Sequence, residues 1–278
     1  MEAVLAQKRR VRSPIGAGIF YPEERKDVLE YLKSFELEEG NGGFAQAIIA
    51  PHGAWNYSGK LAAGAFLSAM GRCMSIKRVV ILGPCHDKRE NGLFLSNSHS
   101  FHTPLGNIPV DQSITEELEF RGSSFEINDI PHLSEHSIEI LLPFVKYCFP
   151  QASIVPILMG QPKAKYIYDL AQSLKTVITP VLEETLIVVS CNLSCDNDRN
   201  TARFLAEETV NLFAEKNSPA LASAILNGKL NSCGGALVAG LFESGLLDRT
   251  RTCSVADNMV SAVGSENNTV YYSELSYG

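Results

Sequence analysis

The stretch Arg78-Val79-Val80-Ile81-Leu82-Gly83 is followed directly by Pro84-Cys85-His86-Asp87. A short apolar run that is rich in β-branched residues and ends at a proline is typical of a strand buried on both faces. Residues 45–50 (AQAIIA), which lead into Pro51 and His52, show the same arrangement. Such strands occur in parallel sheets that helices cover on both sides, so the two segments indicate an α/β fold.

Strand-like and helix-like segments alternate along the rest of the chain. Further strands are expected at residues 153–159 (SIVPILM), 185–190 (TLIVVS), 93–96 and 270–275. Helical periodicity predicts helices at residues 23–35, 59–70, 113–120, 134–147, 166–177, 201–215, 219–226 and 235–246. Ser113 with Glu116 fits a capping box, and Ser218-Pro219 fits an N-cap followed by a first-turn proline. This alternation predicts a three-layer αβα sandwich with a largely parallel or mixed central sheet.

Composition excludes several classes of protein. The chain has 278 residues and a net charge of −7, and an acidic chain argues against a protein that binds the nucleic-acid backbone. Its apolar runs are far shorter than the ~20 residues of a membrane span. Seven cysteines without an export signal favour reduced thiols in the cytoplasm. Residues 1–13, which carry Lys8, Arg9, Arg10 and Arg12, are expected to form a solvated basic tail before one domain at 14–278.

Residues that can bind metals follow three of the predicted strands. His52 follows the first, Cys85 and His86 follow the second, and the strand at 185–190 leads into Cys191-Asn192-Leu193-Ser194-Cys195. We expect these side chains to gather, because the carboxyl ends of parallel strands meet at one edge of a sheet. Two histidines and one more protein ligand, with open positions, are typical of a catalytic metal site. For each histidine, the alternative is a buried, hydrogen-bonded side chain with a structural role.

Two further candidates lie at predicted helix starts. Cys233, within residues 231–235 (NSCGG), is either a metal ligand or nucleophile favoured by a helix N-terminus, or a small buried apolar residue. His136 and Glu139 are three residues apart in the helix expected from residue 134, so they form a candidate His–carboxylate pair on one helix face. The alternative is that Ser134 caps this helix and the acidic first turn is solvated. The remaining histidines, His99, His102 and His132, are expected at the surface or behind the site.

Several short motifs stand in a fixed order along the chain. They are residues 16–22 (GAGIFYP), 47–52 (AIIAPH) with Tyr57-Ser58-Gly59, 80–86 (VILGPCH), 135–144 (EHSIEILLPF), 154–160 (IVPILMG) and Cys233-Gly234. Together they resemble the Memo-like family, and the matches run from about residue 16 to residue 245, which is most of the chain.

The resemblance implies a fold similar to the catalytic subunit of class III extradiol dioxygenases, in which two histidines and an acid hold non-haem Fe(II). In the Memo-like group a cysteine takes the place of the acid, which implies His52, His86 and Cys233 as ligands. The metal implied is Fe(II) or copper, with zinc after them. Some bacterial members belong to a system with a radical-SAM protein and a further partner (AmmeMemoRadiSam), so such proteins, a small molecule or a peptide are the expected partners.

One segment departs from the family pattern. Where the family usually has SSDxxH, residues 190–195 read SCNLSC, so Asn192 replaces an acid and Cys195 replaces the histidine that matches the dioxygenases' general base. An amide cannot titrate, and a thiol is a poorer acid–base group at neutral pH than imidazole. The candidate catalytic residues are therefore Cys195, His136 and Asn192 in a metal-binding, oxidoreductase-type protein that lacks the usual acid–base pair, and whether it is an enzyme stays open.

Two alternatives come from the same residues. The first is a non-catalytic binding or scaffold subunit that keeps the pocket without the proton-transfer groups. The second is a thiol enzyme in which Cys195 or Cys233 is the nucleophile and a histidine is the base, which requires a contact between a cysteine and a histidine.

Overall fold

The computed structural model describes residues 10–35, 42–250, 253–255, 260–263 and 268–278. Within these residues, the central sheet has eight strands in the order β11 (Cys253–Val255), β14 (Leu275–Tyr277), β2 (Ala47–Ala50), β9 (Thr185–Ser190), β3 (Arg78–Pro84), β8 (Ser153–Met159), β4 (Leu93–Leu95) and β7 (Phe125–Ile127). The four strands β2, β9, β3 and β8 are parallel to one another. Strand β14 flanks them antiparallel to β2, and β4 flanks them antiparallel to β8, so the sheet is mixed, as predicted.

Helices cover both faces of this sheet. One layer contains α1 (Arg25–Lys33), α2 (Trp55–Leu67), η1 (Met70–Arg72), η2 (Glu139–Leu141) and α5 (Leu142–Cys148). The other contains α3 (Gln112–Arg121), α6 (Ala164–Ile178), η3 (Thr179–Glu184), α7 (Arg199–Ala214), α8 (Ser218–Leu226) and α9 (Gly235–Glu243). The predicted αβα sandwich is therefore confirmed.

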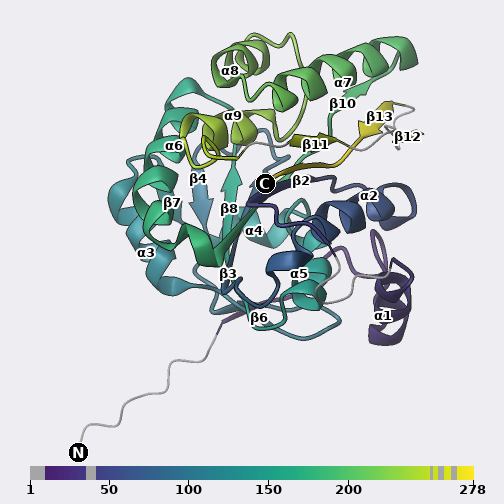
Figure 1. The fold of residues 1–278 in the computed structure, drawn as a ribbon, viewed down its shortest axis with the longest axis vertical. Helices are drawn as coiled ribbons and strands as arrows, with labels where there is room; N and C mark the ends of the chain where they lie inside the picture. Colours follow the sequence, from purple (N-terminus) through teal and green to yellow (C-terminus); the bar gives the residue numbers. More distant parts are fainter. Residues whose placement is uncertain (1–9, 36–41, 251–252, 256–259, 264–267) are drawn as a thin grey trace, which may run out of the picture.

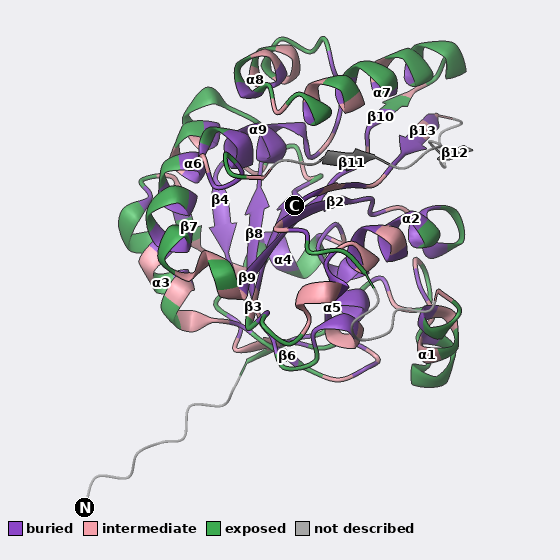
Figure 2. Cartoon of the chain, viewed as in Figure 1, coloured by how far each residue is buried: buried purple, intermediate pink, exposed green. Residues whose placement is uncertain are grey.

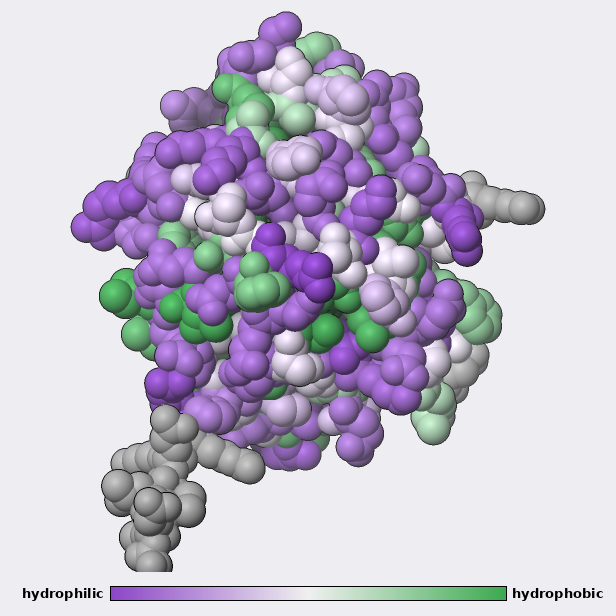
Figure 3. Space-filling view, turned by 90° about the vertical axis from the view of Figure 1, so that its left-hand side faces the viewer, coloured by the Kyte–Doolittle hydropathy of each residue, from purple (hydrophilic) through white to green (hydrophobic). Residues whose placement is uncertain are grey.

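The apolar core is divided by the sheet into two clusters. Successive side chains of β3 alternate between them: Ile81 packs with the α1, α2 and α5 layer, and Leu82 packs with the opposite layer. Every residue of β2 and β9 is buried, and Figure 2 shows the central sheet almost entirely in the colour of buried residues. Burial on both faces explains why these strands are continuously apolar in the sequence. In contrast, Figure 3 shows apolar side chains on one outer face only as small patches among polar ones.

Two small sheets lie beside the central one. The first has the order β1 (Val11–Arg12), β5 (Ser100–Phe101), β6 (Ile108–Pro109), and the second has the order β10 (Ser194–Asp196), β13 (Thr269–Tyr272), β12 (Val260–Val263). The single strand expected at residues 270–275 is wrong. Ser273 and Glu274 interrupt it, so β13 joins the second small sheet while β14 pairs with β2 in the central sheet.

The helix expected at residues 134–147, with a kink near Pro143, is wrong in its first half, whereas residues 142–147 lie in α5. A short helix, α4 (Asp129–Ser134), ends where this helix was expected to begin, and Glu135 is its C-cap residue rather than part of a solvated first turn. Residues 135–138 form an irregular segment because their polar groups bind elsewhere: Ser137 Oγ donates to the Pro84 carbonyl at 2.7 Å. His136 and Glu139 therefore do not share a helix face, and Pro143 lies in the first turn of α5.

Three helix starts differ from those expected. Asp111, not Ser113, caps α3, because its side chain accepts the backbone N–H of Ile114. Asn217, not Ser218, caps α8 by accepting the N–H of Ala220. The helix expected from residue 59 begins earlier, at Trp55.

The N-terminal segment is held by one buried carboxylate. Glu139 pairs with Arg12, and it accepts the backbone N–H of Ile15 at 3.0 Å, the N–H of Gly16 at 2.7 Å and the Tyr21 hydroxyl at 2.9 Å. We call these five residues the Glu139 cluster. Arg12 is thus fully buried, contrary to the expectation of a solvated tail. Lys8 and Arg9 lie outside the described residues, and Arg10 is exposed.

Candidate metal centre

Two histidines and one cysteine meet at the carboxyl edge of the central sheet. His52 follows β2, His86 follows β3, and Cys233 lies just before α9. One ligand atom from each side chain lies within 4.8 Å of the other two. Cys233 Sγ is 3.5 Å from His52 Nε2, and the two imidazole centroids are 5.3 Å apart. The parallel strands β2 and β3 are both paired with β9, which brings the distant histidines together.

The hydrogen bonds of His52 determine its tautomer. Its side chain is only 2% exposed, and its Nδ1 lies 2.7 Å from Ser190 Oγ. Ser190 donates its single hydroxyl proton to the Ser137 carbonyl at 2.6 Å, so it has to accept a hydrogen from His52 Nδ1. The lone pair of this imidazole is therefore on Nε2, the atom that faces Cys233. Burial lowers the pKa of His52, which keeps the ring neutral and able to bind a metal.

His86 is oriented by a carboxylate. Its Nδ1 lies 3.0 and 3.1 Å from the two oxygens of Glu135, which also accept the backbone N–H groups of His86, His136 and Ser137. Burial by itself raises the pKa of Glu135, but the hydrogen bonds from His86 outweigh it and hold that pKa at about 2. Burial lowers the pKa of His86, yet hydrogen bonds to Cys233 and Glu135 raise it to about 10. The His86 side chain is 43% exposed, so this side of the centre is open.

Cys233 lies among backbone and thiol groups. The N–H of Asn192 donates to its sulfur at 3.2 Å, and Cys191, which is fully buried, lies beside it. The contact with Cys191 and burial raise the pKa of the Cys233 thiol. The contact between Cys233 and His52 meets the requirement of a thiol enzyme, but the raised pKa disfavours the thiolate that would attack a substrate.

His136 lies next to the two histidines of the candidate centre. Its ring stacks on Phe20 at 4.6 Å between centroids and on His86 at 5.2 Å. With His86 and Glu135 it forms a second group of potential ligands among the described residues. Its side chain is 27% exposed, and burial lowers its pKa. His136 is thus close to the centre, although Glu139, its expected partner, binds the N-terminal segment instead.

The two residues that depart from the family pattern occupy different positions. Asn192 lies at the centre, where its side-chain oxygen accepts the backbone N–H of His52 at 3.1 Å. Cys195 is exposed in β10, where Asn231 binds its backbone through two hydrogen bonds of 3.2 and 2.6 Å. Neither residue belongs to the ligand groups of the described chain. Asn192 therefore holds the His52 backbone in place, a role that an amide can fill without titrating.

Sequence reasoning missed four residues of this site: Ser190, Glu135, Phe20 and Tyr272. A β-carbon added to Gly53 would lie 2.9 Å from the Tyr272 ring, so Gly53 lets this tyrosine approach the centre. Burial, with the charges of Cys195 and Cys233, raises the pKa of Tyr272 to about 12. Glu135 was visible in the sequence as part of the EHSIE motif, whereas nothing in the sequence marks Tyr272.

Two further candidate side chains are buried outside the ligand groups of the described residues. His132, expected at the surface or behind the site, is buried, and its Nε2 hydrogen bonds to the Phe94 carbonyl at 3.0 Å. Cys85 follows β3 directly but is buried away from the ligand group, and burial raises its pKa to about 11. The donor set at the centre is therefore two imidazoles and one thiol. Such a set suits Fe(II), copper or zinc, and it does not suit magnesium or calcium, which prefer oxygen ligands.

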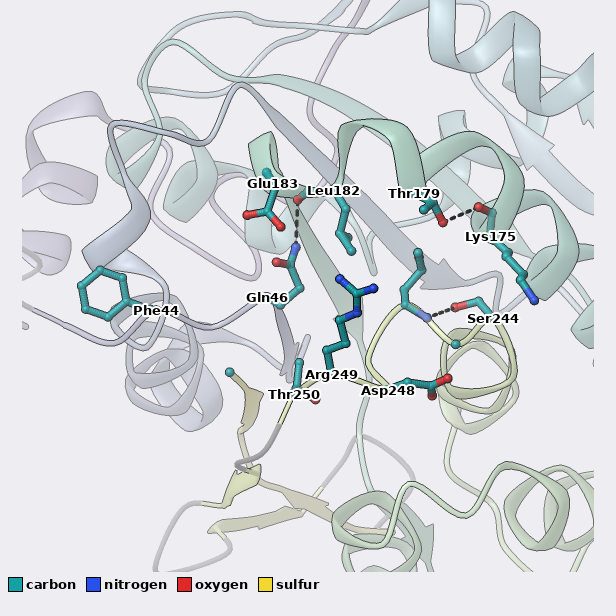
Figure 4. Close-up of a pocket in the computed structure, with 13 residues that line it drawn as sticks. Phe44, Gln46, Lys175, Thr179, Leu182, Glu183, Ser244, Asp248, Arg249 and Thr250 are labelled. Carbon is teal, nitrogen blue, oxygen red and sulfur yellow. Dashed lines mark hydrogen bonds between the residues drawn. The ribbon is translucent and has the colours of Figure 1, made fainter.

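A separate cavity of about 560 Å³ lies at the opposite edge of the sheet. Gln46 precedes β2, and Leu182 and Glu183 belong to η3, which precedes β9, so the cavity is at the amino ends of these strands. Figure 4 shows the Arg249 side chain reaching into it toward Gln46. Its described lining residues contain neither histidine nor cysteine, and they combine basic and acidic side chains. This cavity therefore offers no counterpart to the ligand set at the carboxyl edge.

Comparison with known proteins identifies the family. A "MEMO1 family protein" of Thermotoga maritima is 30% identical over 68% of this chain and 72% of that protein. Another, from Thermotoga neapolitana, is 27% identical over 91% of this chain and 97% of that protein. An uncharacterised Escherichia coli protein of known structure is similar with a TM-score of 0.47 and 12% identity, over 84% of this chain and 99% of that one.

In the described part of the chain, none of the helices has the length and apolar character needed to span a bilayer. The family model described as "Memo-like protein" matches residues 12–276, which include every residue of the candidate centre. The chain therefore belongs to the Memo-like family.

Proposed function

We propose that this chain is a metal-binding protein of oxidoreductase type in which His52, His86 and Cys233 hold Fe(II) or copper, with zinc as the third choice. The observation that carries this proposal is the set of three donor atoms within 4.8 Å of one another. Each imidazole has its Nδ1 engaged by a neighbour, Ser190 or Glu135, which leaves Nε2 as the ligand atom. His86, whose pKa is raised to about 10, would release its Nε2 proton when a metal binds. Partners behind the ligands that orient the rings in this way are typical of metal sites.

Different side chains around the centre would bind the metal and transfer protons. Cys233 would lose its proton on binding the metal and supply a thiolate. When bound, Fe(II) or copper would supply Lewis-acid and one-electron redox chemistry at this open edge. His136, neutral because burial lowers its pKa and still partly exposed, is placed to accept a proton from a small molecule beside His86. Tyr272 keeps its phenolic proton at neutral pH and can donate a hydrogen bond.

Metal analysis tests the ligand set. Untagged protein loaded anaerobically with Fe(II), Cu(I) or Zn(II) should retain about one equivalent after gel filtration, as three converging donors predict. The double variant His52→Ala, His86→Ala should retain almost none. His102→Ala, which removes an exposed imidazole, should behave like the unmodified protein. Equal and negligible metal in the unmodified protein and the double variant would overturn the proposal.

The second candidate is a non-catalytic binding subunit, and the position of Asn192 favours it. The Asn192 side chain binds the His52 backbone, and Cys195 is outside the ligand groups, so the usual acid–base pair is replaced by structural contacts. The chain would then present its pocket to a small molecule, a peptide or radical-SAM-associated partner proteins.

Restoring the acid–base pair separates the two candidates. If the pocket is that of a disabled enzyme, Asn192→Asp with Cys195→His should produce oxygen consumption by the Fe(II)-loaded protein. Unchanged oxygen consumption, with metal retention unchanged, would favour the binding subunit.

A further inference from the structure

Two thiols meet directly behind the candidate centre. Cys191 follows β9, and Cys233 precedes α9, so they are distant in the chain. Their sulfur atoms approach the same carbonyl oxygen, that of Asn192, at 3.4 Å for Cys191 and 3.7 Å for Cys233. The two thiol groups are also within side-chain hydrogen-bonding contact of each other.

Gly234 allows this approach of the two chain segments. A β-carbon built on Gly234 would lie 2.6 Å from the Cys191 β-carbon and 2.9 Å from its sulfur, which are distances that real side chains do not tolerate. The backbone that carries Cys233 therefore runs against the Cys191 side chain. This close passage of two backbones is what a disulfide requires, because the α-carbons of a cystine are usually only about 4.4–6.8 Å apart.

We propose that Cys233 and Cys191 are a peroxide-sensitive pair that closes a disulfide and thereby removes Cys233 from the ligand set. The modification site itself stands on the geometry of the two thiols, and its effect on the metal rests on the proposed function. Cys233 is partly exposed, so a small peroxide can reach it. Cys191 has no exposed surface and lies outside the three-ligand group, so it is placed to react only with an oxidised Cys233.

The chemistry balances in two steps. The Cys233 sulfur attacks one oxygen of hydrogen peroxide as the thiol loses its proton, the O–O bond breaks, and the products are Cys233 sulfenic acid and water. The Cys191 sulfur then attacks the sulfenic sulfur, an S–S bond forms, and the S–O bond breaks. The thiol proton of Cys191 and the departing hydroxyl leave as water. A dithiol reductant reverses the change by thiol–disulfide exchange.

Neighbouring polar groups hold the two thiols close to each other. Ser232 Oγ lies 3.0 Å from Cys191 Sγ and donates to the Asn192 carbonyl at 2.9 Å. The Asn192 N–H donates to Cys233 Sγ at 3.2 Å. Both sulfurs are thus held around one peptide group.

Peptide mapping of the metal-free full chain tests the disulfide. The protein is treated with one equivalent of hydrogen peroxide at neutral pH, alkylated with iodoacetamide and digested without reductant. Cys191 and Cys195 lie between Lys175 and Arg199 and so share a tryptic peptide, which makes chymotryptic cleavage after Leu193 necessary to distinguish them. We expect a cross-link between Cys191 and Cys233 that dithiothreitol removes.

Variants show whether Cys191 is the partner. Cys191→Ser should form no cross-link to Cys233. When a second equivalent of hydrogen peroxide is added, Cys233 of this variant should proceed from the sulfenic to the sulfinic acid, which dithiothreitol does not reverse. Cys195→Ser, which changes the exposed neighbour, should keep the cross-link. Sulfinic acid at Cys233 without a cross-link in the unmodified chain, or a cross-link of Cys233 to Cys195, would overturn the proposal.

A metal titration separates this proposal from the proposed function. Binding of Zn(II) should fall from about one equivalent to almost none after oxidation and return after dithiothreitol, because a disulfide sulfur is no longer a thiolate ligand. If the cross-link forms but Zn(II) binding is unchanged, the pair exists and the ligand set is wrong. If Zn(II) binding depends on Cys233 but no cross-link forms, the ligand set stands and the redox pair is wrong.

Discussion

Glu135 and Glu139 are four residues apart, and both are buried, but they stabilise different parts of the molecule. Glu139 accepts hydrogen bonds from the N-terminal segment and pairs with Arg12. Glu135 accepts three backbone N–H groups at the sheet edge and orients His86. The same type of side chain therefore stabilises the fold at Glu139 and orients a residue of the candidate centre at Glu135. The difference between the two roles comes from the groups that each carboxylate binds.

The largest effect is expected from breaking the Glu139 cluster. Glu139→Ala leaves the buried Arg12 guanidinium unpaired, so the free energy of unfolding should fall by about 3–5 kcal/mol. Urea denaturation followed by circular dichroism measures this change. Replacing both partners, with Arg12→Met and Glu139→Met, should cost less than the single variant, because no buried charge remains. A loss below about 1 kcal/mol in the single variant would show that Glu139 does not hold the fold.

A third carboxylate, that of Glu274, extends the comparison. Its Oε2 is buried and has no hydrogen-bond partner among the residues that the structure describes, and both its oxygens lie close to Gly64 of α2. Burial raises its pKa from 4.5 to about 7. The folded chain thus binds this proton more tightly than the unfolded chain does. The associated stability is fully present below pH 4.5 and is lost as the pH rises through 7.

Glu274→Gln should remove that pH dependence. At pH 8 the variant should be more stable than the unmodified protein by up to about 3 kcal/mol, and the difference should shrink toward pH 4. Denaturant unfolding at a series of pH values measures the stability difference at pH 8 and its decrease toward pH 4. Glu215→Gln, which changes an exposed carboxylate, should leave the profile as it was. A stability difference that does not vary with pH would contradict the role of the unpaired carboxylate.

Glu135→Gln is expected to weaken the centre more than the fold. The glutamine amide is neutral, so it accepts the hydrogen bond from His86 more weakly than a carboxylate does. Metal affinity should therefore fall about 10–100-fold. Competition of Zn(II) with a chromophoric chelator measures the affinity. The loss of unfolding free energy should be smaller than that of Glu139→Ala. If Glu135→Gln destabilises the fold as strongly as Glu139→Ala does and leaves the Zn(II) affinity unchanged, the two carboxylates have the same structural role, which would contradict the comparison.

The smallest effect is expected from Ser190→Ala. His52 would lose the acceptor of its Nδ1 hydrogen, so metal affinity should fall by about tenfold while the ring stays in place by packing. Ser194→Ala is the matched control, because Ser194 is a buried serine whose hydroxyl binds a backbone carbonyl outside the centre. Equal metal affinities in the two variants would show that Ser190 does not orient His52.

Much of the sheet was predictable because its strands are locally distinctive. Strands β8 and β9 have the bounds expected from residues 153–159 and 185–190, since continuous apolar runs can be satisfied only by burial on both faces. The meeting of His52 with His86 followed from the parallel-sheet rule. The inclusion of Cys233 rested on the family resemblance, since its own context left a buried apolar role open. Metal coordination by these residues stays a prediction.

The sequence by itself determined the layers and the edge at which polar side chains collect, because periodicity and strand ends are local properties. Only the tertiary structure decided the conformation of residues 135–138, the burial of Arg12 and the positions of Ser190 and Tyr272. In each of these cases the partner is distant in the chain: Arg12 is 127 residues from Glu139, and Ser190 is 138 residues from His52. Hydrogen bonds between such distant groups form only once the sheet has assembled, so no local pattern in the sequence reveals them.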